Sequence, residues 1–275
     1  MAPGEVWLKA QEVDRRMADF IRSVRKRFGN VVRAYQFGGS FSGIDIARVG
    51  AFEVAYRRCS SDEEVIRDSF DNDTYLAGVP EYRPQPTDTI LDIGAYIGTF
   101  TLLAASTVPH GKVYAIEPCQ DTFNLLRINV ALNALRNVEV SRVALADAKG
   151  QCTLYYSSDT GNWGHSLFQR GSGRGEEVST TTLSDYLTEH RIDRCDYVKM
   201  NCEGAEFRIL LNAPRSVLQR FAVMLVQYHC DLERGHRAEE LDACLRDAGF
   251  ATTIRNCRAE RGWLIASNRQ GHQQT

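Results

Sequence analysis

The sequence predicts an α/β fold with a doubly wound, mostly parallel sheet of seven strands that ends in an antiparallel hairpin. Three observations predict it. From Thr89 onward, short apolar runs alternate with segments of helical periodicity. The last two apolar runs are separated only by the polar stretch 256–261, which is typical of a hairpin. Residues before 87 lack this alternation and begin with a long amphipathic segment, which indicates a helical extension at the N-terminus.

The predicted elements follow one another in the order of an open sheet covered on both faces. We expect strands at 89–93, 112–116, 137–143, 195–200, 221–228, 250–255 and 262–266. We expect helices at 98–107, 120–135, 203–212 and 236–248. Apolar strands that alternate with helices imply parallel strands with helices on both faces of the sheet.

Residues 144–194 interrupt this alternation. Strands are predicted at 151–156 and 177–181, and a short helix with Thr182 as its cap is predicted at 182–190. Between the two strands, 157–175 is rich in Gly, Ser, Asn and Asp and is expected to form a long loop. A loop of this length inside a domain is usually functional or disordered, and we favour contact with the substrate.

The N-terminal region is predicted to contain an amphipathic helix at 5–28 and strand-like pieces at 31–37 and 51–57. Three prolines between 80 and 86 mark a linker. The predicted domains are therefore 1–86, a helix with a capping or lid extension, and 87–275, the main domain. The apolar stripe of the helix is expected to be buried on its own domain, and it would also suit a homodimer interface or a lid over a site.

Composition and charge limit the class of protein. Lys and Arg number 33 against 35 Asp and Glu in 275 residues, and a net charge of −2 argues against bulk affinity for nucleic acid. No apolar run is long enough to span a membrane, and the first residues lack the order of a signal peptide. Eight scattered cysteines without a C-x-x-C pair favour reduced thiols rather than a metal site. We expect a cytoplasmic protein that binds neither nucleic acid nor membranes.

The glycine turn after the first predicted sheet strand is the most informative feature. The chain reads D-x-G-x-x-x-G from Asp92 through Gly94 to Gly98, and the next strand ends on Glu117. Such a strand–turn–helix–strand unit binds the adenosine half of a cofactor. The glycines let the backbone approach the ligand and give it the positive end of a helix, and the carboxylate accepts hydrogen bonds from the ribose hydroxyls.

The glycine spacing decides which cofactor is expected. A dinucleotide fingerprint needs G-x-G-x-x-G, but Tyr96 and Phe100 stand where the second glycine would fall in the two possible registers. Asp92 at the strand end would repel a pyrophosphate but tolerates a ligand that carries a sulfonium and an α-amino group. The pattern therefore favours S-adenosylmethionine over NAD.

Several longer sequence segments between about residues 87 and 267 show a family resemblance. They are AIEP at 115–118, LLRINVALN at 125–133, VALAD at 143–147, VSTTTLSDYL at 178–187, VKMNCEGAEFRILLNA at 198–213 and MLVQYH at 224–229. With these segments the chain resembles the FkbM-type methyltransferases, which are S-adenosylmethionine-dependent enzymes of the class I fold. The resemblance implies methyl transfer to a hydroxyl, often on a sugar or polyketide-type natural product.

Three residues depart from the family pattern. Tyr96 stands where the family usually has Asn, Asn201 where it has Asp, and Gln227 where it has Glu before a histidine. The last two changes keep hydrogen bonding but remove two negative charges, so we expect no metal here. An amide at 201 also cannot act as a general base.

The glycine turn and the resemblance together define the candidate site. The expected cofactor-binding residues are Asp92, Gly94, Ala95, Tyr96, Gly98, Thr99, Glu117, Pro118, Ala144 and Asn201. The expected catalytic residues are His229, Glu203 and His165. Glu206 is interpreted as a helix N-terminal charge, and Lys199 as structural.

Three functions stay open at this point. The first is O-methylation of a small molecule, and the second is N-methylation of a small-molecule amine, which the loss of acidic groups at Asn201 and Gln227 would suit. The third is a cofactor-binding protein without catalysis that acts through its N-terminal helix as an interaction module. The intact set of Asp92, Gly94, Gly98 and Glu117 argues against the third.

Overall fold

The computed structural model describes residues 43–58, 60–71, 74–156, 164–168, 174–233, 235–258 and 260–268. The predicted helix at 5–28 and the predicted strand at 31–37 lie outside these residues, as does most of the loop at 157–175. Within the described residues, no helix has both the length and the apolarity needed to cross a membrane.

Twelve strands and seven helices are described. The strands are β1 (Ile44–Val49), β2 (Phe52–Arg57), β3 (Thr89–Ile93), β4 (Lys112–Ile116), β5 (Val138–Ser141), β6 (Ala144–Leu145), β7 (Gly150–Tyr155), β8 (Gly175–Thr181), β9 (Cys195–Asn201), β10 (Phe221–His229), β11 (Phe250–Arg258) and β12 (Arg261–Asn268). The helices are α2 (Asp62–Phe70), α3 (Thr99–Thr107), α4 (Gln120–Leu132), α5 (Leu183–Glu189), α6 (Glu206–Leu211), α7 (Arg215–Leu218) and α8 (Ala238–Asp247).

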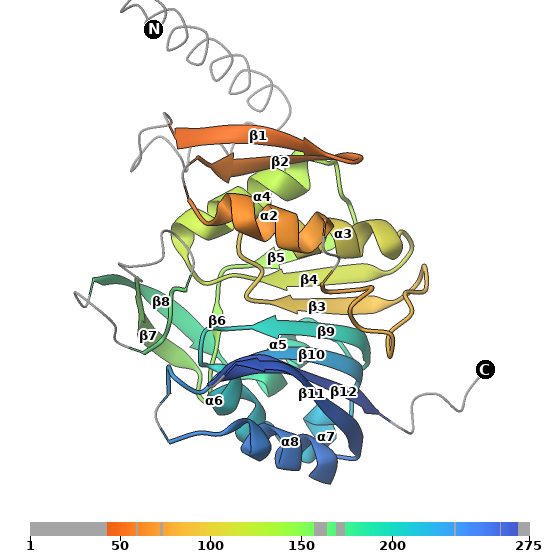
Figure 1. Cartoon of the computed structure of the whole chain (residues 1–275), viewed down its shortest axis with the longest axis vertical. Helices are drawn as coiled ribbons and strands as arrows, with labels where there is room; N and C mark the ends of the chain where they lie inside the picture. The colour runs from red at the N-terminus through yellow and green to blue at the C-terminus, as the bar shows by residue number, and fades with distance from the viewer. Residues whose placement is uncertain are drawn as a thin grey trace, which may run out of the picture.

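The main sheet has seven strands in the order β11-β12-β10-β9-β3-β4-β5 (Figure 1). Neighbouring strands from β10 to β5 are parallel, and β12 is antiparallel to both β10 and β11. The predicted fold class is therefore confirmed. β3 and β4 are parallel neighbours, so the glycine turn and Glu117 lie at the same edge of the sheet.

Buried apolar side chains on both sides of the sheet explain why the chain winds around it. On one face, α5, α6, α7 and α8 contribute Tyr186, Phe207, Val217 and Leu241 to the largest core cluster. On the other face, Phe100 and Ala104 of α3 pack on β3 and β9. Full burial of such a side chain contributes about 1.5–3 kcal/mol, so both helical layers are held mainly by apolar contact.

Most predicted elements agree with the structure to within a few residues, and two differ for a physical reason. The helix predicted at 203–212 begins only at Glu206, because Glu203 and Gly204 have φ values of 50° and 103°. The strands of the final hairpin reach residues 258 and 261, because pairing continues through the polar stretch to Arg258 and Arg261. Thr182 caps α5 as predicted, since its side chain accepts a hydrogen bond from the N–H of Asp185.

The elements β1, β6, α2 and α7 were not predicted. The hairpin of β1 and β2 lies above α2 and α4 at one end of the molecule (Figure 1). Asn129 of α4 fixes it there, because its side chain exchanges hydrogen bonds of 2.7 and 3.0 Å with the backbone N–H and C=O of Ala55. Residues 44–70 thus share an apolar core with α3 and α4. The predicted boundary at residue 86 stays a prediction.

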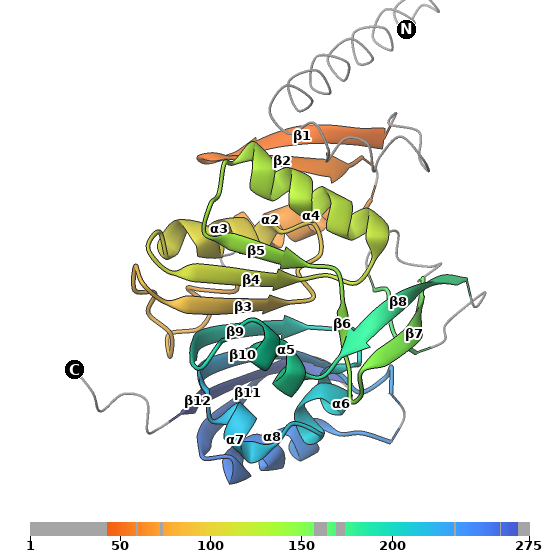
Figure 2. The same cartoon turned by 180° about the vertical axis from the view of Figure 1, so that it is seen from behind.

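A small sheet of order β6-β8-β7 projects from the same edge as the glycine turn (Figure 2). Residues 164–168 lie beside the end of β7, where Tyr155 and Ser166 exchange two backbone hydrogen bonds of 2.8 and 3.0 Å. This arrangement brings His165 and Ser166 close to the ends of the parallel strands.

Candidate active site

A cavity of about 550 Å³ lies at the carboxyl ends of β3, β4 and β9. Ligands of open α/β sheets bind at this edge, and the volume lies within the range of small-molecule sites. Other parts of its wall come from α2, β6, β10, β12 and residues 164–167. The cavity therefore joins the sheet to both the N-terminal region and the small sheet.

The glycine turn forms one wall of the cavity through Gly94, Ala95, Tyr96 and Thr99. Gly94 has a φ of 74°, and a Cβ there would lie 1.8 Å from the backbone oxygen of Asn201. Only glycine allows the turn to pass this close to the end of β9. Four of the predicted cofactor residues are thus brought to one surface.

Gly98 lies under the turn rather than on the cavity wall. It precedes α3 with a φ of 89°, and a Cβ there would lie 2.6 Å from Cδ1 of Leu126 in α4. The positive φ and the close packing of the turn on α4 both favour glycine at this position. The contact of Gly98 with the cofactor stays a prediction.

Asp92 also lies beneath the cavity, fully buried. Its Oδ2 accepts a hydrogen bond from Thr101 Oγ1 at 2.6 Å, and its Oδ1 accepts one from Lys199 Nζ at 3.0 Å. The same Nζ donates to the backbone oxygen of Gly94 at 2.7 Å, and Lys199 is on the cavity wall. Asp92 is therefore held by Thr101 and Lys199 below the cavity, and Lys199 lies between it and the wall. The contact of Asp92 with the methionine end stays a prediction.

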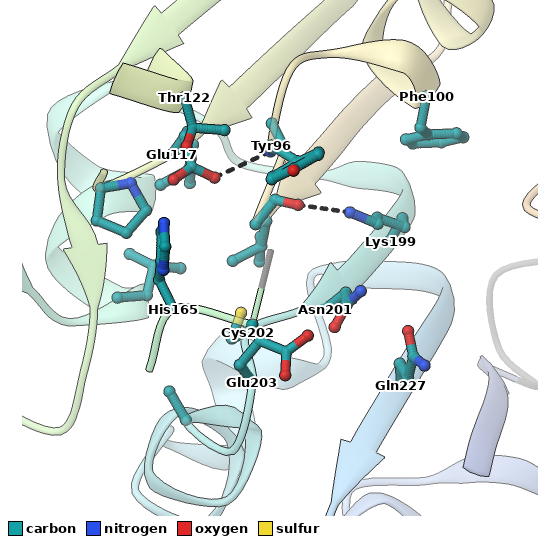
Figure 3. A pocket seen from close by; sticks show the side chains of 18 of the residues that line it. Tyr96, Phe100, Glu117, Thr122, His165, Lys199, Asn201, Cys202, Glu203 and Gln227 are labelled. Atoms are coloured by element: carbon teal, nitrogen blue, oxygen red, sulfur yellow. Dashed lines mark hydrogen bonds between the residues drawn. The ribbon is translucent and has the colours of Figure 1, made fainter. Parts of the chain in front are cut away.

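Glu117 directly follows β4 and lies on the cavity wall, and its contact with a ribose stays a prediction. Its Oε2 accepts from the N–H of Tyr96 at 2.9 Å (Figure 3). Its Oε1 accepts from the N–H of Cys119 at 2.9 Å. Each oxygen keeps a lone pair for a further donor. Burial raises the pKa of the Glu117 carboxyl to about 7, although these two hydrogen bonds act to lower it.

Tyr96 holds the turn through both its backbone and its side chain. It has a φ of 54°, which is uncommon outside glycine. Its hydroxyl donates to Asp62 Oδ1 at 2.5 Å and accepts from Arg57 Nη2 at 3.1 Å. The residue that departs from the family pattern is thus fixed by contacts outside the cavity.

The part of the cavity next to Glu117 is suited to a purine. Pro118 and Ala144 line it together with apolar side chains of Ile116, Val143, Leu145, Leu154 and Leu167. His165 enters from the small sheet, and its buried Nδ1 has no hydrogen-bond partner among the described residues. Burial lowers the pKa of His165, which favours the neutral imidazole.

Glu203 and two amides line the other part of the cavity (Figure 3). Asn201 and Gln227 face each other in register on β9 and β10. The buried Oδ1 of Asn201 has no partner in the described part of the chain. Glu203 has a φ of 50°, and its backbone oxygen accepts from Ser166 Oγ at 2.6 Å. Strained backbone of this kind is common at functional sites.

His229 lies behind Glu203 and is not on the wall. It is 1% exposed, and its Nδ1 lies 3.2 Å from Oε1 of Glu206. Glu206 is fully buried and accepts from the N–H groups of Cys202 and Gly204 at 2.7 and 2.9 Å. Burial acts to lower the pKa of His229, but Glu206 and then Glu203 outweigh it, so the pKa lies above its ordinary value.

An aromatic wall formed by Tyr75, Phe100 and Trp263 also lines the cavity. The ring centroid of Tyr75 lies 5.4 Å from the ring centroid of Phe100 and 5.9 Å from that of Trp263. The sequence does not predict this wall, because its rings come from the N-terminal region, α3 and the last strand. No spacing in the sequence indicates that they meet.

The predicted cofactor, S-adenosylmethionine, fits these residues. Glu117 offers acceptors for ribose hydroxyls, and His165, whose Nδ1 has no partner among the described residues, lines the same cavity. The unpartnered Oδ1 of Asn201, beside the Gly94 turn, can accept from an α-amino group. Buried polar atoms without a partner are uncommon in proteins, so a polar ligand between them accounts for their placement.

Three known proteins share sequence with this chain. AMB antimetabolite synthetase AmbE of Pseudomonas aeruginosa is 28% identical in an alignment of 208 residues that covers 62% of this chain and 10% of that protein. Methyltransferase sdnD of Sordaria araneosa is 27% identical, over 60% of this chain and 74% of its own. The 31-O-demethyl-FK506 methyltransferase FkbM of Streptomyces tacrolimicus is 25% identical, over 76% and 86%. The chain thus spans about a tenth of the length of the first relative.

A solved structure and a family model also match this chain. The crystal structure of a methyltransferase FkbM from Methylobacillus flagellatus aligns with 70% of this chain and 47% of its own, at 16% identity and a TM-score of 0.48. The model of the methyltransferase FkbM domain matches residues 92–251, which is more than half of the 275 residues. The chain therefore belongs to the FkbM family of methyltransferases, and its cofactor is S-adenosylmethionine.

Proposed function

We propose that the protein methylates a hydroxyl group of a small molecule, such as a natural product or a sugar. The observation that carries this proposal is the position of Glu203. Its carboxylate lies on the cavity wall, it is 14% exposed, and His229 and Glu206 stand behind it. A hydroxyl acceptor must lose a proton as it is methylated, and Glu203 is the carboxylate next to the two strand-end amides that can take it.

When bound, S-adenosylmethionine supplies a methyl group that is already activated by its sulfonium. The protein's task is then to hold two reactants in line, which can contribute roughly 7–11 kcal/mol. Glu117, Pro118 and Ala144 bind the adenosine end in this proposal, with His165 as a further contact. Gly94, Ala95, Tyr96, Thr99 and Asn201 surround the methionine end.

Glu203 acts as the general base in this proposal, and such a base contributes about 10²–10⁴-fold. His229 Nδ1 is oriented by Glu206, which leaves Nε2 directed at Glu203. His229 is therefore assigned a positioning role, since it does not reach the cavity wall. This departs from the role as base that the sequence suggested for His229 and His165.

The aromatic wall and the relatives support a ring-bearing small molecule as the acceptor. Flat aromatic faces of Tyr75, Phe100 and Trp263 suit contact with a ring. One relative is named for methylation at O-31 of a demethylated FK506, and another for synthesis of an antimetabolite. Each name describes chemistry on a small molecule.

The test is conversion of S-adenosylmethionine to S-adenosylhomocysteine by the purified protein with two acceptor panels. One panel contains hydroxyl compounds, namely macrolide alcohols, methyl glycosides and phenols, and the other contains amines of the same skeletons. Turnover with hydroxyl compounds that depends on Glu203 supports the proposal. Turnover confined to amines and insensitive to Glu203→Gln would establish the N-methyltransferase alternative instead. Binding of S-adenosylhomocysteine without any turnover would favour the non-catalytic interaction protein.

A cytoplasmic location, the absence of a nucleic acid partner and a homodimer through residues 5–28 stay predictions. Sedimentation of the full chain tests the dimer, and a monomer at micromolar concentration would exclude it.

A further inference from the structure

The N-terminal region contributes directly to the cavity wall. Val65 and Asp68 of α2, followed by Thr74 and Tyr75, line the cavity on the side of the aromatic wall. The backbone oxygen of Tyr75 accepts a hydrogen bond from the hydroxyl of Tyr197 in β9, which fixes this segment on the main sheet. The wall that faces the acceptor in the proposed function is therefore partly built from residues that precede the sheet.

A buried network joins α2 to the glycine turn. Asp62, the first residue of α2, is fully buried and accepts from Arg57 Nε at 2.9 Å and Arg57 Nη2 at 2.8 Å. The same carboxylate accepts from the Tyr96 hydroxyl at 2.5 Å, and Arg57 Nη2 donates to that hydroxyl at 3.1 Å. Charged, bidentate hydrogen bonds in a buried setting are among the strongest polar contacts in proteins. Arg57 and Asp62 are outside the cavity wall.

The network ends on Tyr96, which hydrogen-bonds the carboxylate of Glu117, the expected ribose-binding residue. Tyr96 donates its backbone N–H to Glu117 Oε2 from a left-handed conformation that tyrosine rarely adopts. Its side chain has to be held from outside for this conformation to persist. The contacts with Asp62 and Arg57 supply that restraint.

We propose that the Arg57–Asp62–Tyr96 network couples the cofactor site to the acceptor wall on α2. Tyr96 is a positioning residue: its anchored side chain fixes the turn that orients Glu117. Cofactor bound at Glu117 then favours the placement of α2 that the wall requires, because coupling between two sites acts equally in both directions. The assignment of α2 to the acceptor wall rests on the proposed function, whereas the coupling itself requires only cofactor binding.

The network also gives a role to the N-terminal region beyond covering the core. Asp62, which does not line the cavity, is expected to change the affinity for the cofactor through the Tyr96 hydroxyl, which points out of the cavity. Tyr96→Phe removes one hydroxyl and keeps the ring, and the Arg57–Asp62 ion pair is retained, so this variant is expected to fold. Asp62→Asn removes the charge that anchors the hydroxyl.

Calorimetric binding of S-adenosylhomocysteine to the full chain tests the coupling. We expect Tyr96→Phe and Asp62→Asn each to weaken binding roughly tenfold, within the usual range of coupling between sites. The double variant should lose no more than the worse single variant, because both changes break the same link. Additive losses, or unchanged affinity in Tyr96→Phe, would overturn the proposal.

Tyr82→Phe is the matched control. Tyr82 also donates its hydroxyl to an aspartate, Asp88 Oδ2 at 2.9 Å, but neither residue lines the cavity or contacts the turn. Its affinity for S-adenosylhomocysteine should equal that of the parent chain. An equal loss in Tyr82→Phe would mean that removing any such hydroxyl weakens binding through stability alone, and would overturn the assignment.

Hydrogen exchange measures the reverse direction of the coupling. S-adenosylhomocysteine should protect the backbone amides of α2 in the parent chain, and this protection should be lost in Tyr96→Phe at saturating ligand. Equal protection in both proteins would overturn the proposal. If the parent chain shows this protection and Tyr96→Phe loses it, but the parent chain transfers no methyl group to any acceptor, the coupling stands and the proposed function is contradicted.

Discussion

Glu203 Oε2 and His229 Nε2 lie 3.8 Å apart, with Glu203 on the cavity wall and His229 buried behind it. In the proposed function this order sets the role of each residue. The carboxylate takes the proton of the acceptor, and the imidazole, held by Glu206 on its other side, positions that carboxylate.

Replacement of Glu203 by glutamine should separate catalysis from cofactor binding. We expect kcat of Glu203→Gln to fall about 10²–10⁴-fold, because an amide cannot take the acceptor proton. Affinity for S-adenosylhomocysteine should stay within about twofold. Single-turnover kinetics and calorimetry measure the two quantities, and Glu189→Gln, on the exposed end of α5, is the control. A kcat within threefold of the parent would exclude Glu203 as the base.

His229 should give the protein a pH-dependent stability. Its pKa is raised in the folded state, so the stability it contributes is fully present below its unfolded pKa of about 6.5. That contribution is lost as the pH rises through the folded value. We expect His229→Gln to be less stable than the parent at pH 6 and to lack this decline at higher pH. Urea unfolding from pH 5.5 to 9 measures it, with His110→Gln as an exposed control. Parallel curves for parent and variant would contradict the assignment.

Cofactor affinity should rise with pH around neutrality. The pKa of Glu117 is raised to about 7, so the carboxyl is mostly protonated at pH 6. Ribose hydroxyls bond more strongly to the charged carboxylate than to the neutral acid. Calorimetry with S-adenosylhomocysteine should therefore show tighter binding at pH 8 than at pH 6, with release of protons at pH 7. Glu117→Gln should bind more weakly and lose most of this dependence. A flat profile in the parent would show that Glu117 is already fully charged.

Gly94 should tolerate no side chain. A Cβ there would lie 1.8 Å from a backbone oxygen of Asn201, and the residue has a φ of 74°. Strain of this kind and overpacking each cost about 1–3 kcal/mol, so Gly94→Ala should lose at least about 2 kcal/mol of stability. Gly150→Ala is the control, because its nearest neighbour would be 3.8 Å away. Equal denaturation midpoints for the two variants would contradict this packing.

Local sequence predicted the parts of the fold and site that depend on neighbouring residues. The strands at 89–93 and 112–116 have the predicted bounds, because buried parallel strands leave short, mainly apolar runs in the sequence. The Gly94 turn and Glu117 follow directly from these strands, so their meeting at one edge could be foreseen.

The remaining features depend on contacts between distant segments. No pattern in the sequence indicates that Asp92 contacts Lys199, which lies 107 positions away in the chain. His229 ends its strand beside Glu206, and this burial could not be told from exposure to a substrate. Tyr75 precedes the main sheet in a segment without a periodic pattern, so its place in the wall appears only in the folded chain.

The most direct test of the account is calorimetric binding of S-adenosylhomocysteine to the parent chain and to Glu117→Ala, with NADH as the comparison. We expect micromolar binding that the substitution weakens by about 1.5–3 kcal/mol, the usual contribution of hydrogen bonds to a charged group. NADH should bind more weakly than S-adenosylhomocysteine. Equal affinity of parent and variant, or preferred binding of NADH, would contradict the placement of the cofactor at Glu117.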